Sequence, residues 1–371
     1  MGLQFQFGII SDLHIAMPHT IWDSPNRFHL VEISQDALNS ALEHFSQLDL
    51  DFVLLPGDLT QHGEADNHRW LAERLSQVPC PVYVVPGNHD IVQAEAADGR
   101  IGLAEFPKYY EKYGFNQDAR PYYKQPLLPG VSLIGLNSIA FDKTGQQLPT
   151  GWLDNAQIQW LEETLANLSD DLTLVMIHHN VLEHLPGQAK SPLGQRYMLK
   201  NTDRLRSLLR GTSAKLILTG HLHVQDVVPR DRGDGLCEIT TGSLVSYPHP
   251  YRVVSLSQQA SGDWKLEIKS YRITATSEWA DVQTRSRQWM GDRSYPFMIK
   301  LLTHHPFCLP AETAAQIAPD LREFWANITA GDTQFDLSAI PAHLHRYFEP
   351  FNVPVVEGKP QTIDNFATLY L

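Results

Sequence analysis

The apolar positions in the first 220 residues fall into short runs, each of the length of a buried β-strand, separated by stretches with helical spacing. The runs predict strands at 5–11, 52–55, 82–85, 131–136, 172–177 and 215–218. Between them, apolar residues recur every three or four positions at 30–45, 67–75, 158–168 and 205–209. Such spacing predicts amphipathic helices that pack on a sheet. Because strands and helices alternate, this part of the chain is predicted to be α/β with parallel strands.

Two of the predicted helices carry terminal signals. Asp154 and Gln157 have the spacing of a capping box before the helix at 158–168. Asn201 or Thr202 can cap the helix at 205–209, and Gly211 suits its carboxyl end. These signals support the predicted helix boundaries.

The pattern changes in the second half of the chain. Shorter β-favouring runs predict a more antiparallel group of strands at 224–228, 237–241, 251–256 and 264–268. Beyond about Tyr271, loosely helical spacing broken by prolines predicts helices at 277–302, 311–326 and 337–351. We therefore expect one domain at 1–270 and a mainly helical C-terminal accessory region at 271–371. The aromatic residues of this region are interpreted as part of its core or of a partner-binding surface. Whether the region caps a site, forms a dimer interface or does neither stays open.

Polar side chains follow five of the predicted strands at their carboxyl ends. These side chains are Asp12 and His14, Asp58, the run Asn88-His89-Asp90, the pair His178-His179, and His221 with His223. Taken singly, an Asp there is often a helix cap and a His is often a hydrogen-bonded core residue. Five strand ends that carry only carboxylate, carboxamide and imidazole groups are hard to explain in this way. In a doubly wound sheet such ends converge on one edge, which predicts a shared site.

The chemistry of these side chains favours metal binding. A mixture of nitrogen and oxygen donors without sulfur suits Fe, Mn or Zn, whereas an all-oxygen set would suit Mg²⁺ or Ca²⁺. There are enough donors for two ions, which need a shared carboxylate to lie about 3.5–4 Å apart. Such a pair lowers the pKa of a bound water and clamps phosphate oxygens. The set of donors therefore suits hydrolytic chemistry, including in-line displacement at phosphorus.

Composition and net charge limit the classes of molecule that the protein is expected to bind. The chain has 371 residues and a formal net charge of −13, which argues against a protein that coats nucleic acid. It does not exclude an anionic small substrate, because metal ions supply local positive charge. The three cysteines are scattered, no apolar stretch is long enough to span a bilayer, and no leader is recognised. We therefore expect a cytoplasmic protein.

The order of the motifs resembles a known family. Asp12-x-His14, Gly57-Asp58, Gly87-Asn88-His89-Asp90, His178 and Gly220-His221-x-His223 are similar to the motif set of the calcineurin-like metallophosphoesterases. Their spread over about the first 225 residues resembles the bacterial class III cyclic-nucleotide phosphodiesterase and glycerophosphodiesterase branch. The resemblance implies a four-layer αββα sandwich with a two-metal site at one sheet edge. It does not extend to the tail beyond Tyr271.

The resemblance also implies a role for each motif residue. One ion would be held by Asp12, His14 and His223, the other by Asn88, His178 and His221, with Asp58 bridging them. His89 would be the catalytic residue, which stabilises the transition state or protonates the leaving alkoxide. Asp90 would orient a neighbour, and His179 would lie at the substrate rim. Asn180-Val181 depart from the two prolines that often follow the His pair in relatives, which puts the shape of that loop in doubt.

The expected function is thus hydrolysis of a small phosphodiester, of cyclic-nucleotide or glycerophosphodiester type, by a metal-bridging hydroxide. Alternatives within the class are a pyrophosphatase of a nucleotide-linked metabolite and a phosphomonoesterase. An alternative from another class is a non-catalytic scaffold that keeps the fold. The expected partner is a small phosphorylated substrate rather than nucleic acid, and a homodimer stays open.

Overall fold

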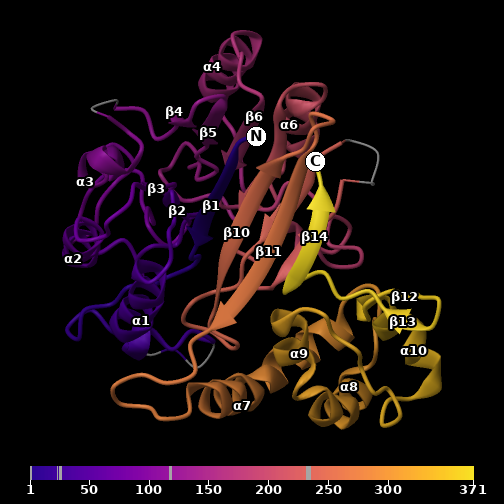
Figure 1. The fold of residues 1–371 in the computed structure, drawn as a ribbon. Coiled ribbons are helices and arrows are strands. Elements are labelled where there is room, and N and C mark those ends of the chain that lie inside the picture. The colour runs from indigo at the N-terminus through magenta and orange to yellow at the C-terminus, as the bar shows by residue number, and fades with distance from the viewer. Residues whose placement is uncertain (1, 23, 25–26, 117–118, 231–234) are drawn as a thin grey trace.

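Two six-stranded sheets form the centre of the protein, as seen in a computed structural model that describes residues 2–22, 24, 27–116, 119–230 and 235–371. The strand order is β14-β11-β10-β1-β2-β3 in the first sheet and β4-β5-β6-β7-β9-β8 in the second. Figure 1 shows the strands in the middle of the molecule with helices around them. Mixed α/β architecture is therefore confirmed.

The first sheet combines parallel and antiparallel strands. Its parallel strands are β1 (Gln4–Ile9), β2 (Phe52–Leu55) and β3 (Val82–Val84). Its antiparallel strands are β10 (Pro250–Gln258), β11 (Trp264–Arg272) and β14 (Phe366–Tyr370). Helices α1 (Ser34–Ser46) and α2 (Ala65–Leu75) pack against it. Gly8 of β1 leaves room for the ring of Phe45 of α1, since a Cβ there would lie 2.4 Å from that ring.

The second sheet has its own helical layer. Its strands are β4 (Tyr123–Leu128), β5 (Val131–Gly135), β6 (Leu172–Met176), β7 (Ala214–Thr219), β8 (Asp226–Val228) and β9 (Cys237–Thr240). Alternate side chains such as Leu133 and Leu174 join the core shared with the first sheet. Ile134 and Val175 point the other way, into a separate cluster with α4 (Asn155–Ala166) and α6 (Thr202–Leu209). This arrangement is the predicted four-layer αββα sandwich.

The start of α4 shows half of the predicted capping box. Oδ1 of Asp154 accepts a 2.7 Å hydrogen bond from the backbone amide of Gln157. The side chain of Gln157 does not reach back to Asp154, and instead bonds the backbone amide and carbonyl of Asn137, both at 2.8 Å. A tertiary contact thus replaces the local one. Sequence reasoning did not predict three short elements. They are helices α3 (Phe106–Tyr109) and α5 (Pro192–Gln195) and strand β4.

Residues 282–351 form the C-terminal helical part. It contains α7 (Val282–Thr303), α8 (Ala311–Ile317), α9 (Phe324–Ala330) and α10 (His345–Phe348), packed around an apolar cluster of its own. Figure 1 shows these helices gathered at one end of the sheets. After a two-stranded ribbon, β12 (Val355–Val356) with β13 (Lys359–Pro360), the chain returns as β14 and pairs with β11. The C-terminal helices were predicted and β14 was not, while the division at residue 270 stays a prediction.

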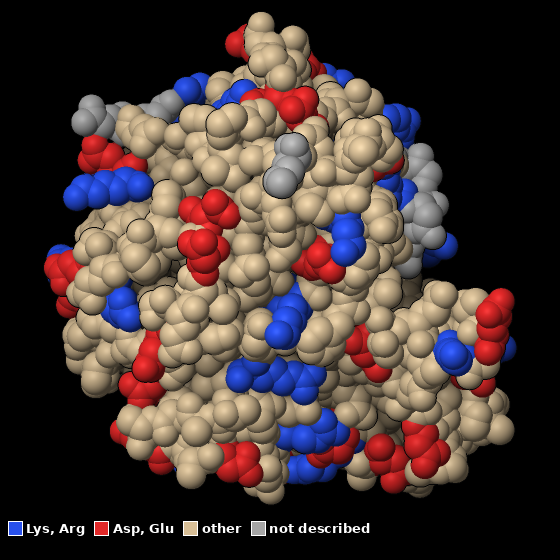
Figure 2. Space-filling view, viewed as in Figure 1, with Lys and Arg blue, Asp and Glu red and all other residues tan. Residues whose placement is uncertain are grey.

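The charged residues are unevenly distributed on the face shown in Figure 2. Asp and Glu side chains are scattered over this face, and several Lys and Arg side chains gather in its lower half. Within the part of the chain that the structure describes, no helix has both the length and the apolarity needed to cross a bilayer.

Candidate metal centre

The loops that follow β1, β2, β3, β6 and β7 bring the predicted site residues together. In each sheet the relevant strands run parallel, so their carboxyl ends lie on the same side. The first sheet delivers Asp12, His14, Asp58, Asn88 and His89, and the second delivers His178, His221 and His223. The convergence expected for one sheet edge therefore occurs between the edges of two sheets.

One group of donors forms around the loop after β1. Asp12, His14, Asp58 and His223 each offer an atom within 4.8 Å of the others. Oδ1 of Asp12 lies 3.0 Å from Nε2 of His223, and Oδ2 of Asp58 lies 3.8 Å from Nε2 of His14. The Asp and His14 side chains are fully buried or nearly so.

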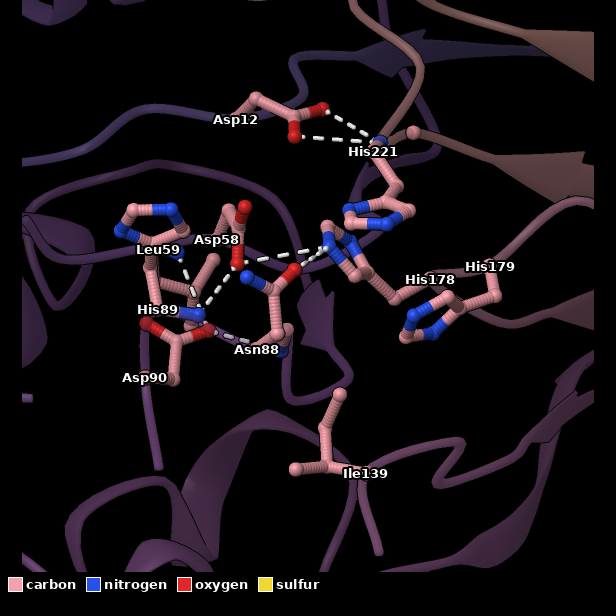
Figure 3. Close-up of polar contacts among 12 residues, drawn as sticks. Asp12, Asp58, Leu59, Asn88, His89, Asp90, Ile139, His178, His179 and His221 are labelled. Atoms are coloured by element: carbon pink, nitrogen blue, oxygen red, sulfur yellow. Dashed lines mark hydrogen bonds and ion pairs between the residues drawn. The ribbon is translucent and has the colours of Figure 1, made fainter. Parts of the chain in front are cut away.

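A second group forms on the other side of Asp58. Asp58, His178 and His221 likewise offer atoms within 4.8 Å of one another. Nε2 of His178 lies 3.1 Å from Oδ1 of Asn88 and 3.3 Å from Oδ1 of Asp58. Figure 3 shows His178 and Asn88 pointing at each other beside Asp58. The carboxylate of Asp58 thus belongs to both groups, one oxygen facing each.

Hydrogen bonds orient two of the imidazoles. Nδ1 of His178 donates to the carbonyl oxygen of Pro56 at 2.9 Å, which directs Nε2 towards Asp58. Nε2 of His221 donates to the carbonyl oxygen of Arg196 at 3.2 Å, which leaves Nδ1 as the donor atom for a metal. These assignments follow from carbonyl partners, which only accept. Backbone carbonyls commonly orient metal-binding histidines in this way.

Five of the candidate ligands have a left-handed backbone conformation, which is rare for residues other than glycine. They are Asp12, His14, Asp58, His221 and His223, with φ values of 52°, 42°, 49°, 65° and 58°. Each such residue costs about 1–3 kcal/mol and persists where its surroundings enforce it. Strain concentrated at these positions marks the cluster as a functional site.

Glycines allow the loops to approach one another. A Cβ on Gly87 would lie 2.1 Å from the backbone nitrogen of Asp58, and one on Gly220 would lie 2.4 Å from Oδ2 of Asp12. A Cβ on Gly57 would lie 2.5 Å from the ring of His178. Each glycine in the Gly-Asp, Gly-Asn-His and Gly-His motifs is therefore required by a neighbouring loop.

Asp58 and His178 have pKa values that are shifted against the effect of burial. Burial alone would raise the pKa of Asp58, but His178 and His89 outweigh it and hold this pKa well below its usual range. Burial alone would lower the pKa of His178, but Asp58 outweighs it and raises that pKa to about 9. Burial and nearby imidazoles lower the pKa of His14 and His221. His14 and His221 are thus held as neutral nitrogen donors beside the ionised carboxylate of Asp58, and such a mixture of nitrogen and oxygen donors fits transition-metal ions.

His89 lies beside the metal-binding groups on the wall of a cavity of about 710 Å³. Nδ1 of His89 donates to the carbonyl oxygen of Gln61 at 2.7 Å, which leaves Nε2 on the opposite side of the ring. The backbone amide of His89 donates to Oδ1 of Asp58 at 2.8 Å. Asp58, Asn88, His221 and His223 also line this cavity.

The two remaining predicted residues lie off the cavity wall. Asp90 is buried, and its carboxylate accepts hydrogen bonds from the backbone amides of Leu59, Thr60 and Gly87 at 3.1, 2.8 and 2.8 Å. It therefore ties the loop after β2 to the loop after β3. His179 is only 3% exposed, bonds the hydroxyl of Ser138 through Nδ1, and packs against the ring of His221. The family resemblance implies a place for His179 at the substrate rim, and that role stays a prediction.

Sequence reasoning missed His29, which lines the cavity and stacks on His14 with ring centroids 4.2 Å apart. His14, His29 and His223 form a third group of nitrogen donors within 4.8 Å, and Nδ1 of His29 is buried without a hydrogen-bond partner. His29 belongs to an irregular segment rather than to a strand end. A search confined to strand ends had no means of finding it.

Comparisons with known proteins agree with this architecture. The family model described as calcineurin-like phosphoesterase matches residues 5–225. A 3′,5′-cyclic-nucleotide phosphodiesterase of Nostoc sp. is 27% identical over 217 residues, which cover 58% of this chain and 71% of the relative. A probable glycerophosphodiester phosphodiesterase of Arcobacter nitrofigilis is 26% identical over 221 residues, covering 58% and 70%.

A solved structure shows the same fold. The crystal structure of a dimetal phosphatase from Danio rerio aligns with a TM-score of 0.53 at 18% identity, covering 72% of this chain and 96% of that one. The predicted resemblance is confirmed by the family match, which spans more than half of the chain. The chain thus belongs to the calcineurin-like phosphoesterase family and is a hydrolase with a candidate metal-binding cluster.

Proposed function

We propose that this protein is a dinuclear metal-dependent phosphodiesterase that hydrolyses a small phosphodiester. The observation that carries the proposal is the shared position of Asp58, whose carboxylate lies in both groups of donors. A buried carboxylate between two sets of nitrogen and oxygen donors is what a two-metal site requires.

The residues divide into two ligand sets. We assign Asp12, His14 and His223 to one ion, Asn88, His178 and His221 to the other, and Asp58 to both. When bound, two such ions would activate a water for attack at phosphorus and neutralise charge on the phosphate oxygens. The ions would be Fe, Mn or Zn, a prediction that rests on the mixed donors.

His89 supplies the proton that the leaving group needs. Its Nδ1 is engaged by Gln61, so a proton on Nε2 can be delivered to the departing alkoxide on the cavity side. Asp90 holds the loop that carries His89 against the loop that carries Asp58, and so fixes the distance between acid and phosphate. His179 supports His221 through ring packing.

The names of the relatives support a phosphodiester substrate. A cyclic-nucleotide phosphodiesterase and a probable glycerophosphodiester phosphodiesterase each match 58% of this chain, and the family model covers residues 5–225, which carry all the proposed ligands. Hydrolysis of a nucleotide-linked pyrophosphate or of a phosphomonoester is the alternative within the class. A scaffold without activity is the alternative outside it, and the completeness of the ligand set speaks against it. A cytoplasmic location and a homodimer stay predictions.

A direct assay tests the proposal. Purified protein loaded with Mn²⁺ should release nitrophenol from bis(p-nitrophenyl) phosphate, and chelation followed by dialysis should abolish the release until metal is restored. A panel of cyclic nucleotides, glycerophosphodiesters, monoesters and dinucleotide pyrophosphates then ranks the substrates by kcat/KM. Equal rates for metal-free and loaded protein would refute the mechanism, and a higher kcat/KM for monoesters would favour the alternative.

A further inference from the structure

The C-terminal helical part forms one wall of the cavity that contains the candidate metal ligands. Residues of α7, α9 and α10 line the same 710 Å³ cavity as Asp58, Asn88 and His89. In Figure 1 these helices lie together at one end of the sheets. A ligand that extends from the proposed metal site through this cavity would therefore meet this wall.

Side-chain packing connects this wall to the loops that carry the proposed metal ligands. Leu222 stands between His221 and His223 in the sequence, and its buried side chain belongs to the apolar cluster of the C-terminal helical part. Phe297 of α7 also contacts Phe28, next to His29, with ring centroids 6.4 Å apart. The wall is thus packed directly against the loops that carry the site.

The wall is mainly apolar and offers few neutral hydrogen-bonding groups. Its described lining residues from the C-terminal helical part are chiefly aromatic or aliphatic, among them Phe297, Leu301, Phe307, Trp325, Ile328 and Phe351. No Asn, Gln, Ser or Thr from residues 282–351 lines the cavity. The neutral hydrogen-bonding side chains of this wall are Trp325 and Tyr347, and the hydroxyl oxygen of Tyr347 accepts a 2.7 Å hydrogen bond from Arg346. A nucleobase presents more donors and acceptors along its edges than these two neutral side chains can pair, and each group left unpaired costs about 1–3 kcal/mol. A hydrocarbon carries no such cost.

The charged residues of the cavity are complementary to an anion. Among its described lining residues Asp58 is the one carboxylate, whereas Arg196, Arg293, Lys300 and Arg346 are cationic. Nε of Arg293 is buried without a hydrogen-bond partner, and its guanidinium lies 3.2 Å from the centroid of the Trp289 ring. In a chain with a net charge of −13, this local excess of positive charge would attract a phosphodiester into the cavity.

We propose that the substrate is an amphiphilic phosphodiester whose hydrocarbon chain lies against the wall formed by the C-terminal helical part, while its phosphate lies at the metals. This inference rests on the proposed function and names its substrate class. The hydrocarbon chain takes no part in the reaction. We expect its burial to stabilise the ground state and the transition state equally, which lowers KM and leaves kcat level.

A series of p-nitrophenyl alkyl phosphates, from methyl to octyl, tests the proposal with the metal-loaded full chain below the critical micelle concentration of each ester. KM should fall by up to about fourfold per added methylene, the fold-change for complete burial of one CH₂, while kcat stays level. The thymidine 5′ ester of p-nitrophenyl phosphate should have a higher KM than the octyl ester.

Two variants test whether the hydrocarbon chain lies against the wall formed by the C-terminal helical part. Trp325→Ala should raise KM for the octyl ester at least about fivefold more than KM for the methyl ester. Phe335→Ala is the matched control, because Phe335 is a partly buried aromatic residue of the same cluster that does not line the cavity. Its ratio of octyl to methyl KM should equal that of the unchanged protein.

Three results would overturn the inference: a KM that does not change with chain length, a preference for the thymidine ester, or equal changes in the two variants. These results differ from failure of the proposed function, in which none of the esters is hydrolysed by the metal-loaded protein.

Discussion

The backbone amide of His89 donates a 2.8 Å hydrogen bond to Oδ1 of Asp58, which joins the proposed acid to the proposed bridging ligand. Because the donor is a backbone group, substitution of the His89 side chain leaves this bond in place. The two side chains can therefore be altered separately, and their roles can be told apart.

Asp58→Asn should abolish metal pairing. An amide is a poor bridge because it offers one neutral oxygen where the carboxylate offers two charged ones. Elemental analysis should then find fewer than two transition-metal ions per chain, and phosphodiesterase activity should fall with the metal content. Asp203→Asn, at a side chain that is 97% exposed, is the control and should retain both. Full activity in Asp58→Asn would contradict its assignment as the bridge.

His89→Ala should keep both metals and lower kcat by about 10²–10⁴-fold, the usual contribution of a positioned acid or base. The loss should be greatest for alkyl leaving groups, because an alkoxide needs a proton more than p-nitrophenolate does. Steady-state kinetics on matched diesters measure the difference, with metal content checked in parallel. A loss that is the same for all leaving groups would refute proton donation, and a loss of metal would show that His89 is a ligand.

Gly87→Ala should impair metal binding although no ligand is altered. Its Cβ would lie 2.1 Å from the backbone nitrogen of Asp58, so one of the two loops must move. We expect weaker metal retention during dialysis and a matching loss of activity. Gly99→Ala is the control, because it has a positive φ of 74° but no atom within 4 Å of the added carbon. It should cost about 1 kcal/mol of stability and leave the metals bound.

Stability should depend on pH through His184, which is buried away from the proposed ligands. Its Nδ1 lies 2.6 Å from Oδ2 of Asp226 and its Nε2 lies 3.0 Å from Oε1 of Glu238. Burial alone would lower the pKa of His184, but the two carboxylates outweigh it and raise this pKa to about 9. Since the folded pKa exceeds the unfolded value of about 6.5, the protonated form stabilises the fold by about 3 kcal/mol below pH 6.5.

That contribution should disappear as the pH rises through about 9. Urea unfolding of the unchanged protein and of His184→Gln, at intervals from about pH 6 to pH 10, should show a difference in unfolding free energy that shrinks with pH. A difference that stays constant over this range would mean that His184 is neutral in the folded state.

Much of the site could be predicted from local pattern. Asp58 and His178 each follow a buried apolar run, and a strand that ends in a ligand-type side chain is visible without any tertiary information. The four-layer fold was predicted through the resemblance of the motif set. Hydrophobic periodicity also located α1 and β6 to within a few residues, because burial on one or both faces constrains the sequence directly.

What the sequence by itself determined is the set of donors and the elements that carry them, since both are local properties of the chain. Only the tertiary structure decided that Asp58 faces two groups of donors, that His29 stacks on His14, and that His179 is buried outside the cavity lining. It also decided that residues 282–351 form a wall of that cavity. Contacts between segments so distant in the sequence depend on how two sheets and a helical cluster pack. Hydrophobic periodicity shows which face of a segment is buried but not which distant segment covers that face.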